Sequence, residues 1–116
     1  MKGTNLGEFE ELILLIVGVL YPNAYGLSIR SAVLEQTNRR VAIGAVHSAL
    51  SRLEEKGFLI STLADATNER GGRRKKLFTI TSAGRQAVEK NRELRNSLWN
   101  KIPELAWNKL SYGFSQ

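Results

Sequence analysis

Residues 69–78 constrain the fold most, because they read Glu-Arg-Gly-Gly-Arg-Arg-Lys-Lys-Leu-Phe. Two glycines and five cations stand here between two strand-like runs, residues 58–67 and 77–81. Glycine permits the positive φ angles that tight turns need, and hairpin turns are rich in it. The segment therefore predicts the tip of a β-hairpin that is positively charged on both sides.

A short amphipathic helix is predicted directly before this hairpin, over residues 44–56. Its apolar stripe follows the i, i+3, i+4, i+7 spacing and consists of Val46, Ala49, Leu50 and Leu53. Gly57 is the residue type that ends helices in the left-handed conformation. At 100° per residue, the opposite face is small and polar. It carries Gly44, Ser48, Ser51 and Glu55, with His47 and Arg52 at its flanks.

Three further helices are predicted over residues 7–20, 24–36 and 83–102. The first is apolar nearly all round, which indicates burial on more than one side. Thr81 or Ser82 is expected to cap the last helix, and Pro103 to kink or restart it. Residues 41–43 are β-prone and predict a single rung of strand. The fold class is therefore mainly α with one small β-hairpin.

Length, composition and charge place limits on the function. The chain has 116 residues, which fits one domain with a modest core, and no cysteine, which excludes disulfides and thiolate metal sites. Its longest apolar run is about half of the ~20 residues that a membrane span needs, so we expect a cytoplasmic protein. The formal charge is +6, and residues 39–76 carry nine cations against four anions. A polyanion would be attracted to the middle of the chain.

The order helix, helix, short strand, helix, hairpin is that of the winged helix-turn-helix. We expect residues 1–82 to form this DNA-binding domain, and residues 83–116 to form a C-terminal dimerisation helix and tail within one compact unit. In this architecture the third helix enters the major groove with its N-terminal end first. Its start must be slim, and the cations of the hairpin, called the wing (residues 69–78), would contact the flanking phosphates.

Several spaced motifs between residues 10 and 90 then carry a resemblance. They are residues 24–29 (AYGLSI), 41–44 (VAIG), 49–59 (ALSRLEEKGFL), 71–81 (GGRRKKLFTIT) and Gly84. As a set they resemble the PadR family of bacterial transcriptional regulators. The resemblance implies a homodimeric DNA-binding regulator, usually a repressor, with dimer contacts from the last helix. It also implies that the positions after Gly44 and the wing residues Arg73, Arg74 and Lys75 contact DNA.

The chain departs from the family pattern directly after Gly44. The family commonly has Thr-Leu-Tyr-Pro there, and this chain has Ala45-Val46-His47-Ser48. The aromatic residue and the proline are both lost. The resemblance therefore carries over the placement of the helix on DNA, but it does not carry over the base preference.

The candidate DNA-binding residues lie before the third helix, on its outer face or in the wing. They are Arg39, Arg40, Gly44, Ala45, His47, Ser48, Ser51, Arg52, Arg70, Arg73, Arg74, Lys75 and Lys76. Alternatives remain open for several of them. The cations at 70–76 are also compatible with a solvated turn, and Arg52 with pairing to Glu54 or Glu55. His47 is compatible with DNA or with solvent, and Tyr25 with core packing or a phosphate contact.

The C-terminal part carries a second group of candidates, for a dimer or ligand site: Leu94, Leu98, Trp99 and Trp107. A long amphipathic helix must bury its apolar face, so dimer packing is favoured here. Some PadR members bind flat aromatic compounds between C-terminal tryptophans, so the resemblance also implies an aromatic-compound sensor as an alternative.

Catalysis is not expected, since the chain has no phosphate-binding loop, no nucleophile with a nearby base and no paired carboxylates. We expect no cofactor, and no metal site because His47 is the only histidine. The expected partners are double-stranded DNA, a second copy of the chain and, in the sensor alternative, a small aromatic effector. A winged-helix protein-interaction module without DNA binding is a further alternative, supported by the departure after Gly44.

Overall fold

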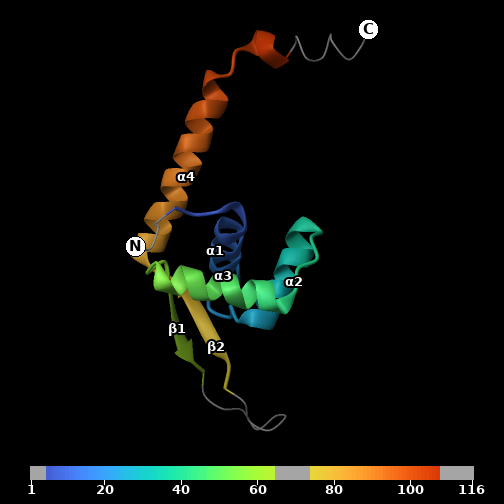
Figure 1. Cartoon of the computed structure of the whole chain (residues 1–116), viewed down its shortest axis with the longest axis vertical. Coiled ribbons are helices and arrows are strands. Elements are labelled where there is room, and N and C mark those ends of the chain that lie inside the picture. The colour runs from blue at the N-terminus through green and yellow to red at the C-terminus, as the bar shows by residue number, and fades with distance from the viewer. Residues whose placement is uncertain (1–4, 65–73, 108–116) are drawn as a thin grey trace.

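The structure, a computed structural model, describes residues 5–64 and 74–107. In chain order its elements are α1 (Glu8–Leu20), α2 (Gly26–Thr37), α3 (Ile43–Glu55), β1 (Leu59–Leu63), β2 (Lys76–Ile80) and α4 (Ser82–Lys101). The first three helices pack together, the hairpin projects from one side of them, and α4 extends away in the opposite direction (Figure 1). The mainly helical winged-helix fold is confirmed.

The hydrophobic core lies between α1, α2 and α3 and is closed by the hairpin. All four residues of the predicted apolar stripe on α3 are buried, and none is more than 1% exposed. In α1, residues 13, 14, 16 and 17 are all buried, as the apolar run predicted. Burial of side chains of this size stabilises the fold by about 1.5–3 kcal/mol each, so these stripes orient α3 and leave its polar face outward.

The junction between α3 and β1 is set by Gly57, whose φ is +79°. The Gly57 amide donates to the Glu54 carbonyl over 3.0 Å, and the Phe58 amide donates to the Leu53 carbonyl over 2.9 Å. This pair of bonds is the Schellman motif, which needs a left-handed residue at the position of Gly57. The helix end was thus predicted correctly, and it fixes where the hairpin leaves α3.

The hairpin is antiparallel, with Leu59 opposite Ile80 and Leu63 opposite Lys76. The Ala64 amide donates to the Lys75 carbonyl over 2.8 Å, which extends the pairing by one step. The two strands confirm the predicted hairpin arms within the described residues. Residues 65–73, which include the predicted tip, lie outside them.

Two predictions about the second helix and the turn after it were wrong. The strand rung at 41–43 is not formed: Ala42 is the extended N-cap of α3, and Ile43 is already helical. Val41 and Ile43 instead pack against the core as partly buried side chains, so burial rather than strand pairing explains their type. The start of α2 lies two residues later than predicted, because Ser28 Oγ accepts the Tyr25 amide over 2.9 Å and fixes Tyr25 as the N-cap.

The start of α4 lies against the α3–β1 junction. Thr81 Oγ1 accepts the Gly84 amide over 3.0 Å, so the predicted cap is confirmed. A Cβ built on Gly84 would lie 2.3 Å from the Phe58 carbonyl oxygen, so only glycine fits this crossing. The helix ends before Pro103, and residues 104–107 are helical again, which confirms the predicted restart. Within the described ranges, no helix is long and apolar enough to cross a membrane.

Candidate nucleic-acid interface

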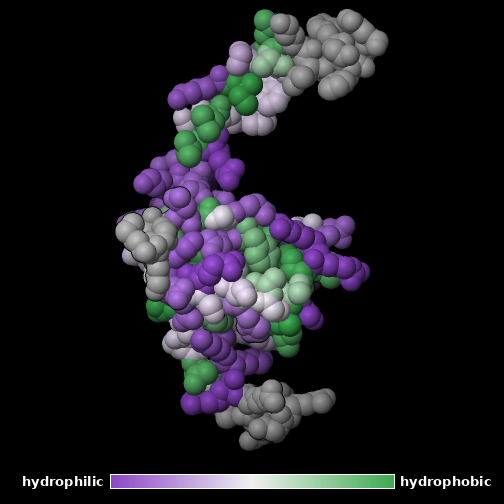
Figure 2. Space-filling view, viewed as in Figure 1, coloured by the Kyte–Doolittle hydropathy of each residue, from purple (hydrophilic) through white to green (hydrophobic). Residues whose placement is uncertain are grey.

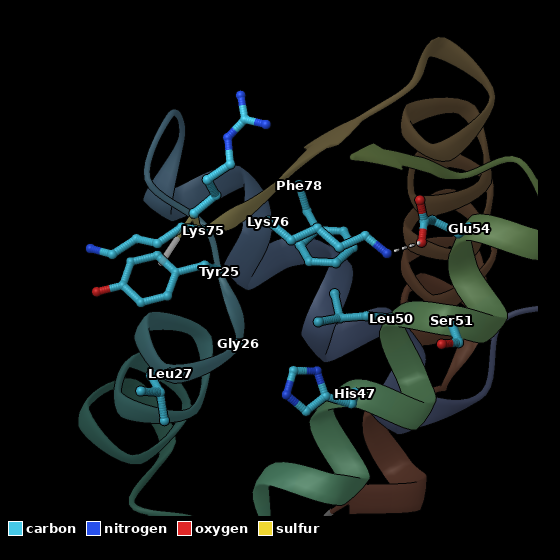
Figure 3. Close-up of a pocket in the computed structure, with 11 residues that line it drawn as sticks. Tyr25, Gly26, Leu27, His47, Leu50, Ser51, Glu54, Lys75, Lys76 and Phe78 are labelled. Carbon is cyan, nitrogen blue, oxygen red and sulfur yellow. Dashed lines mark hydrogen bonds and ion pairs between the residues drawn. The ribbon is translucent and has the colours of Figure 1, made fainter. Parts of the chain in front are cut away.

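A pocket of about 380 Å³ lies where the start of α2, the outer flank of α3 and the described part of the wing meet (Figure 3). We call it the wing pocket. Its lining residues are Tyr25, Gly26, Leu27, His47, Leu50, Ser51, Glu54, Arg74, Lys75, Lys76 and Phe78. The fold therefore brings predicted residues of α3 and of the wing, from distant parts of the sequence, to one surface.

The three described wing cations are exposed but held in defined positions. The Lys75 ammonium lies 4.4 Å from the centre of the Tyr25 ring, a cation–π distance. Lys76 Nζ lies 3.4 Å from Glu54 Oε1, and Arg74 Nε donates to the Ala64 carbonyl over 3.2 Å. Each cation still faces solvent and remains open to a phosphate. Arg70 and Arg73, also predicted to bind DNA, lie outside the described residues.

Glu54 connects α3 to both strands of the hairpin, a role that the sequence did not indicate. Its Oε2 accepts a hydrogen bond from Ser61 Oγ on β1 over 2.7 Å, and its Oε1 pairs with Lys76 on β2. The carboxylate thereby links α3 to the hairpin at two points. It could not be identified from sequence spacing, because Ser61 and Lys76 meet it only through the hairpin register.

The first turns of α3 are slim and open to solvent. Gly44, Ala45, His47, Ser48 and Ser51 are all exposed. A Cβ built on Gly44 would meet no atom within 4 Å. Ala42 provides no side-chain cap, and its carbonyl accepts the Ala45 and Val46 amides over 3.0 and 3.2 Å. The Ile43 and Gly44 amides, at this positive end of the helix dipole, are left for an external acceptor. The predicted slim face is present at the expected place.

Close approach of α2 to α3 depends on Gly26. A Cβ built on Gly26 would lie 2.7 Å from His47 Cε1. His47 therefore covers Gly26 from the side of the wing pocket, and Tyr25 lies next to it (Figure 3). Tyr25 is only partly buried, and the Lys75 ammonium lies over its ring. Tyr25 is therefore not a core residue.

The opposite flank of α3 is tied to α1. Arg52 bonds to a glutamate of α1, which the sequence did not indicate: its Nε donates to Glu10 Oε2 over 2.9 Å. Lys56 Nζ donates to Glu10 Oε1 over 2.7 Å, and the Glu10 side chain is 8% exposed. Burial raises the pKa of Glu10, but the hydrogen bonds from Lys56, Gly7 and Arg52 outweigh it and leave the pKa below its ordinary value. The DNA contact predicted for Arg52 stays a prediction.

The two arginines before α3 differ in their surroundings. Arg39 pairs with Glu8 over 2.8 Å and lies 5.3 Å from the centre of the Phe9 ring. This hydrogen bond and the charge of Arg39 lower the pKa of Glu8. Among the described residues, Arg40 has no side-chain hydrogen bond or ion pair. Arg40 is therefore the freer of the two for a phosphate.

The far half of α4 presents an apolar strip to solvent (Figure 2). Leu94, Leu98 and Trp99 are all more than half exposed. The Trp107 ring packs on the Trp99 ring with 5.3 Å between centroids and 41° between planes. In the described ranges, no cluster of histidines and carboxylates could hold a metal ion.

The family assignment follows from comparison with known proteins. The model of the transcriptional regulator PadR-like family matches residues 13–90. The chain belongs to this family. As a PadR-family transcriptional regulator, it is a member of a family of DNA-binding regulators. The match covers most of α1, all of α2, α3 and the wing, and the start of α4. Among these, α2, α3 and the wing supply the residues that line the wing pocket.

Solved PadR-family structures share the fold. A PadR-family regulator from Eggerthella lenta superposes with a TM-score of 0.64 at 19% identity, covering 85% of this chain and 86% of that one. For a PadR-like regulator from Bacillus cereus the TM-score is 0.65 at 20% identity, with 84% and 90% covered. A transcriptional regulator from Clostridium thermocellum gives 0.61 at 21% identity, with 82% and 92% covered. No curated protein matches the sequence at a significant level.

Proposed function

We propose that this PadR-family protein binds operator DNA as a homodimer, through α3 and the wing, and represses transcription. The observation that carries the proposal is the wing pocket, in which the exposed flank of α3 and the cations Arg74, Lys75 and Lys76 face one space. A groove reader needs base-contacting and phosphate-contacting groups on the same surface.

The two sets of residues have different roles in this proposal. Gly44, Ala45, His47 and Ser48 are small or planar and lie at the open start of α3, where base edges would come closest. The wing cations supply affinity and register on the backbone. Loss of a phosphate contact weakens binding to all sequences alike, whereas loss of a base contact changes the preferred sequence.

Binding of the full chain to fluorescent duplex DNA, measured by anisotropy over a range of salt concentrations, tests the proposal. A DNA-binding protein that contacts ~6 phosphates loses about a thousand-fold in affinity between 50 and 200 mM salt. Lys75→Gln should reduce the salt slope and weaken binding to specific and random duplexes equally. His47→Ala should instead reduce the ratio of the affinity for the specific duplex to the affinity for the random duplex.

Arg85→Gln on α4 is the matched control, since Arg85 is exposed and its one ion pair among the described residues is with Glu89 on the same helix. It should leave both affinity and slope near wild type. Absence of wild-type binding at 50 mM salt would contradict DNA binding and would favour the protein-interaction alternative.

The homodimer is supported by the apolar strip of α4. An exposed group of large apolar side chains is typical of an interface between chains. Leu94, Leu98 and Trp99 of this group lie on α4, and Ile102, Leu105 and Trp107 come after its end in the chain. Light scattering on the full chain measures the mass directly, and a monomer at micromolar concentration would contradict this part of the proposal.

An aromatic effector is a second candidate function, because the Trp99 side chain is 64% exposed. A flat aromatic compound would stack on this ring. Titration with planar dyes should quench tryptophan fluorescence and weaken DNA binding in wild type, and Trp99→Leu should remove both effects. A DNA affinity that does not change with dye would contradict the sensor.

A further inference from the structure

A second cationic pocket lies at the other end of α2. It has a volume of about 320 Å³ and is lined by Arg30, Ser31, Leu34, Arg40 and Val41. We call it the arginine pocket. Arg30 lies directly after the motif at residues 24–29, and the fold places it beside Arg40 in the lining of this pocket.

Both arginines of this pocket are free to bind a ligand. Arg30 and Arg40 are exposed, and within residues 5–64 and 74–107 their side chains have no hydrogen bond or ion pair. Arg39, which precedes Arg40 in sequence, is by contrast paired with Glu8. Two guanidinium groups and the Ser31 hydroxyl around one hollow provide hydrogen-bond donors for an anion. Guanidinium groups are well suited to phosphate, because they donate two parallel hydrogen bonds to it.

The arginine pocket and the wing pocket lie along one side of α2. At 100° per residue, Leu27 of the wing pocket and Arg30, Ser31 and Leu34 of the arginine pocket fall within one arc of about 100°. At about 1.5 Å per residue, α2 rises about 4–5 Å from Leu27 to Arg30, the nearest lining residues of the two pockets, and about 12 Å from Gly26 to Leu34, the farthest. The two pockets therefore follow one another along the helix within about 12 Å, the width of the major groove.

The start of α3 lies between the two pockets along the chain. Val41 lines the arginine pocket, and His47 lines the wing pocket. Gly44, the open position at which base edges would come closest, is between them in sequence. A helix inserted in the major groove has a phosphate backbone on either side of it, and the wing cations occupy one side only.

We propose that the arginine pocket binds a phosphodiester of the DNA backbone, on the edge of the major groove opposite to the wing. Arg30 is the residue that this assigns newly, with Arg40 beside it. The proposal rests on DNA binding by α3 and the wing. It makes the contact two-sided, so that α3 is held in the groove from both edges.

Arg30→Gln tests it, because an exposed side chain without a partner can be neutralised without disturbing the core. Each lost phosphate contact makes the plot of log affinity against log salt concentration less steep by about 0.9. If the variant and wild type bind equally at 1 M salt, the variant should therefore bind about eightfold more weakly than wild type at 0.1 M. We expect this loss on specific and random duplexes alike. Arg92→Gln, which removes an exposed arginine from α4, is the matched control and should bind as wild type does.

The outcomes separate this proposal from the function on which it rests. If wild type binds DNA and Arg30→Gln binds it with the same affinity and slope, the arginine pocket is not a DNA contact and the function stands. If wild type binds no DNA, both fail. A free anion as ligand is distinguished by calorimetric titration with inorganic phosphate: millimolar binding that Arg30→Gln abolishes, without any change in DNA affinity, would overturn the proposal.

Discussion

Replacement of Gly84 by alanine should destabilise the fold, whereas the same change at Gly44 should not. The new Cβ at Gly84 would lie 2.3 Å from the Phe58 carbonyl oxygen and 3.1 Å from its carbonyl carbon, which are backbone atoms held by the α3–β1 junction. Overpacking costs about 1–3 kcal/mol, and the upper part of this range, about 2–3 kcal/mol, applies here because backbone rather than the end of a flexible side chain must shift. Alanine regains about 1 kcal/mol of helix propensity in return. We therefore expect a net loss of about 1–2 kcal/mol in the free energy of unfolding for Gly84→Ala.

Gly44→Ala is the matched control, because its Cβ enters open space in a helical position. It should gain about 0.5–1 kcal/mol. With an unfolding entropy of about 2.1 cal/mol/K per residue, 1 kcal/mol corresponds to about 4 °C in a chain of this length. Thermal unfolding followed by circular dichroism should thus separate the two variants by about 6–12 °C. A Gly84→Ala variant as stable as wild type would refute the close approach of α4 to Phe58.

Three further outcomes follow from the contacts described. Glu10→Gln should lower the free energy of unfolding by about 1–3 kcal/mol at pH 7, because it weakens the hydrogen bonds from Arg52 and Lys56. Since the folded pKa of Glu10 is lowered, this stabilisation is complete above the ordinary value of 4.5 and is lost as the pH falls through the folded pKa. Urea unfolding of wild type and Glu10→Gln at pH 7 and pH 2 measures this difference. A difference in the free energy of unfolding that persists at pH 2 would contradict the prediction. Leu98→Glu should shift the light-scattering mass toward a monomer, and an unchanged mass would exclude Leu98 from the interface. Glu54→Gln should keep the Ser61 bond but free Lys76, and should raise affinity for random duplex DNA at low salt; lower affinity would contradict this.

The sequence was sufficient to predict the element order, the apolar stripe of α3 and the hairpin that follows it. These features are local, since they depend on helical spacing, on the φ angle of Gly57 and on strand alternation. The prediction of a strand rung at 41–43 was wrong because β-branched apolar residues such as Val41 and Ile43 also serve as partly buried side chains at the start of a helix. Sequence alone does not distinguish burial from strand pairing.

The site was predicted in its parts but not in its internal contacts. Placement of the wing cations beside α3 follows from the fold class. The ion-pair partners of Arg39, Arg52 and Lys76 do not follow from the fold class. Each partner is a glutamate that is distant in sequence and contacts its cation only in the folded chain. Glu10 is the clearest example, since Arg52 is 42 residues away from it in sequence. Long-range pairs of this kind leave no periodic signal.

Selection of bound sequences from a random DNA pool by the full chain tests the central claim most directly. A homodimer that places two α3 helices in successive major grooves should enrich an inverted repeat with half-sites about 10 base pairs apart, centre to centre. The Gly44→Ala variant, which is expected to be at least as stable, should enrich it less or select a different repeat. Recovery of no preferred sequence by the wild-type chain would contradict sequence-specific DNA binding by α3.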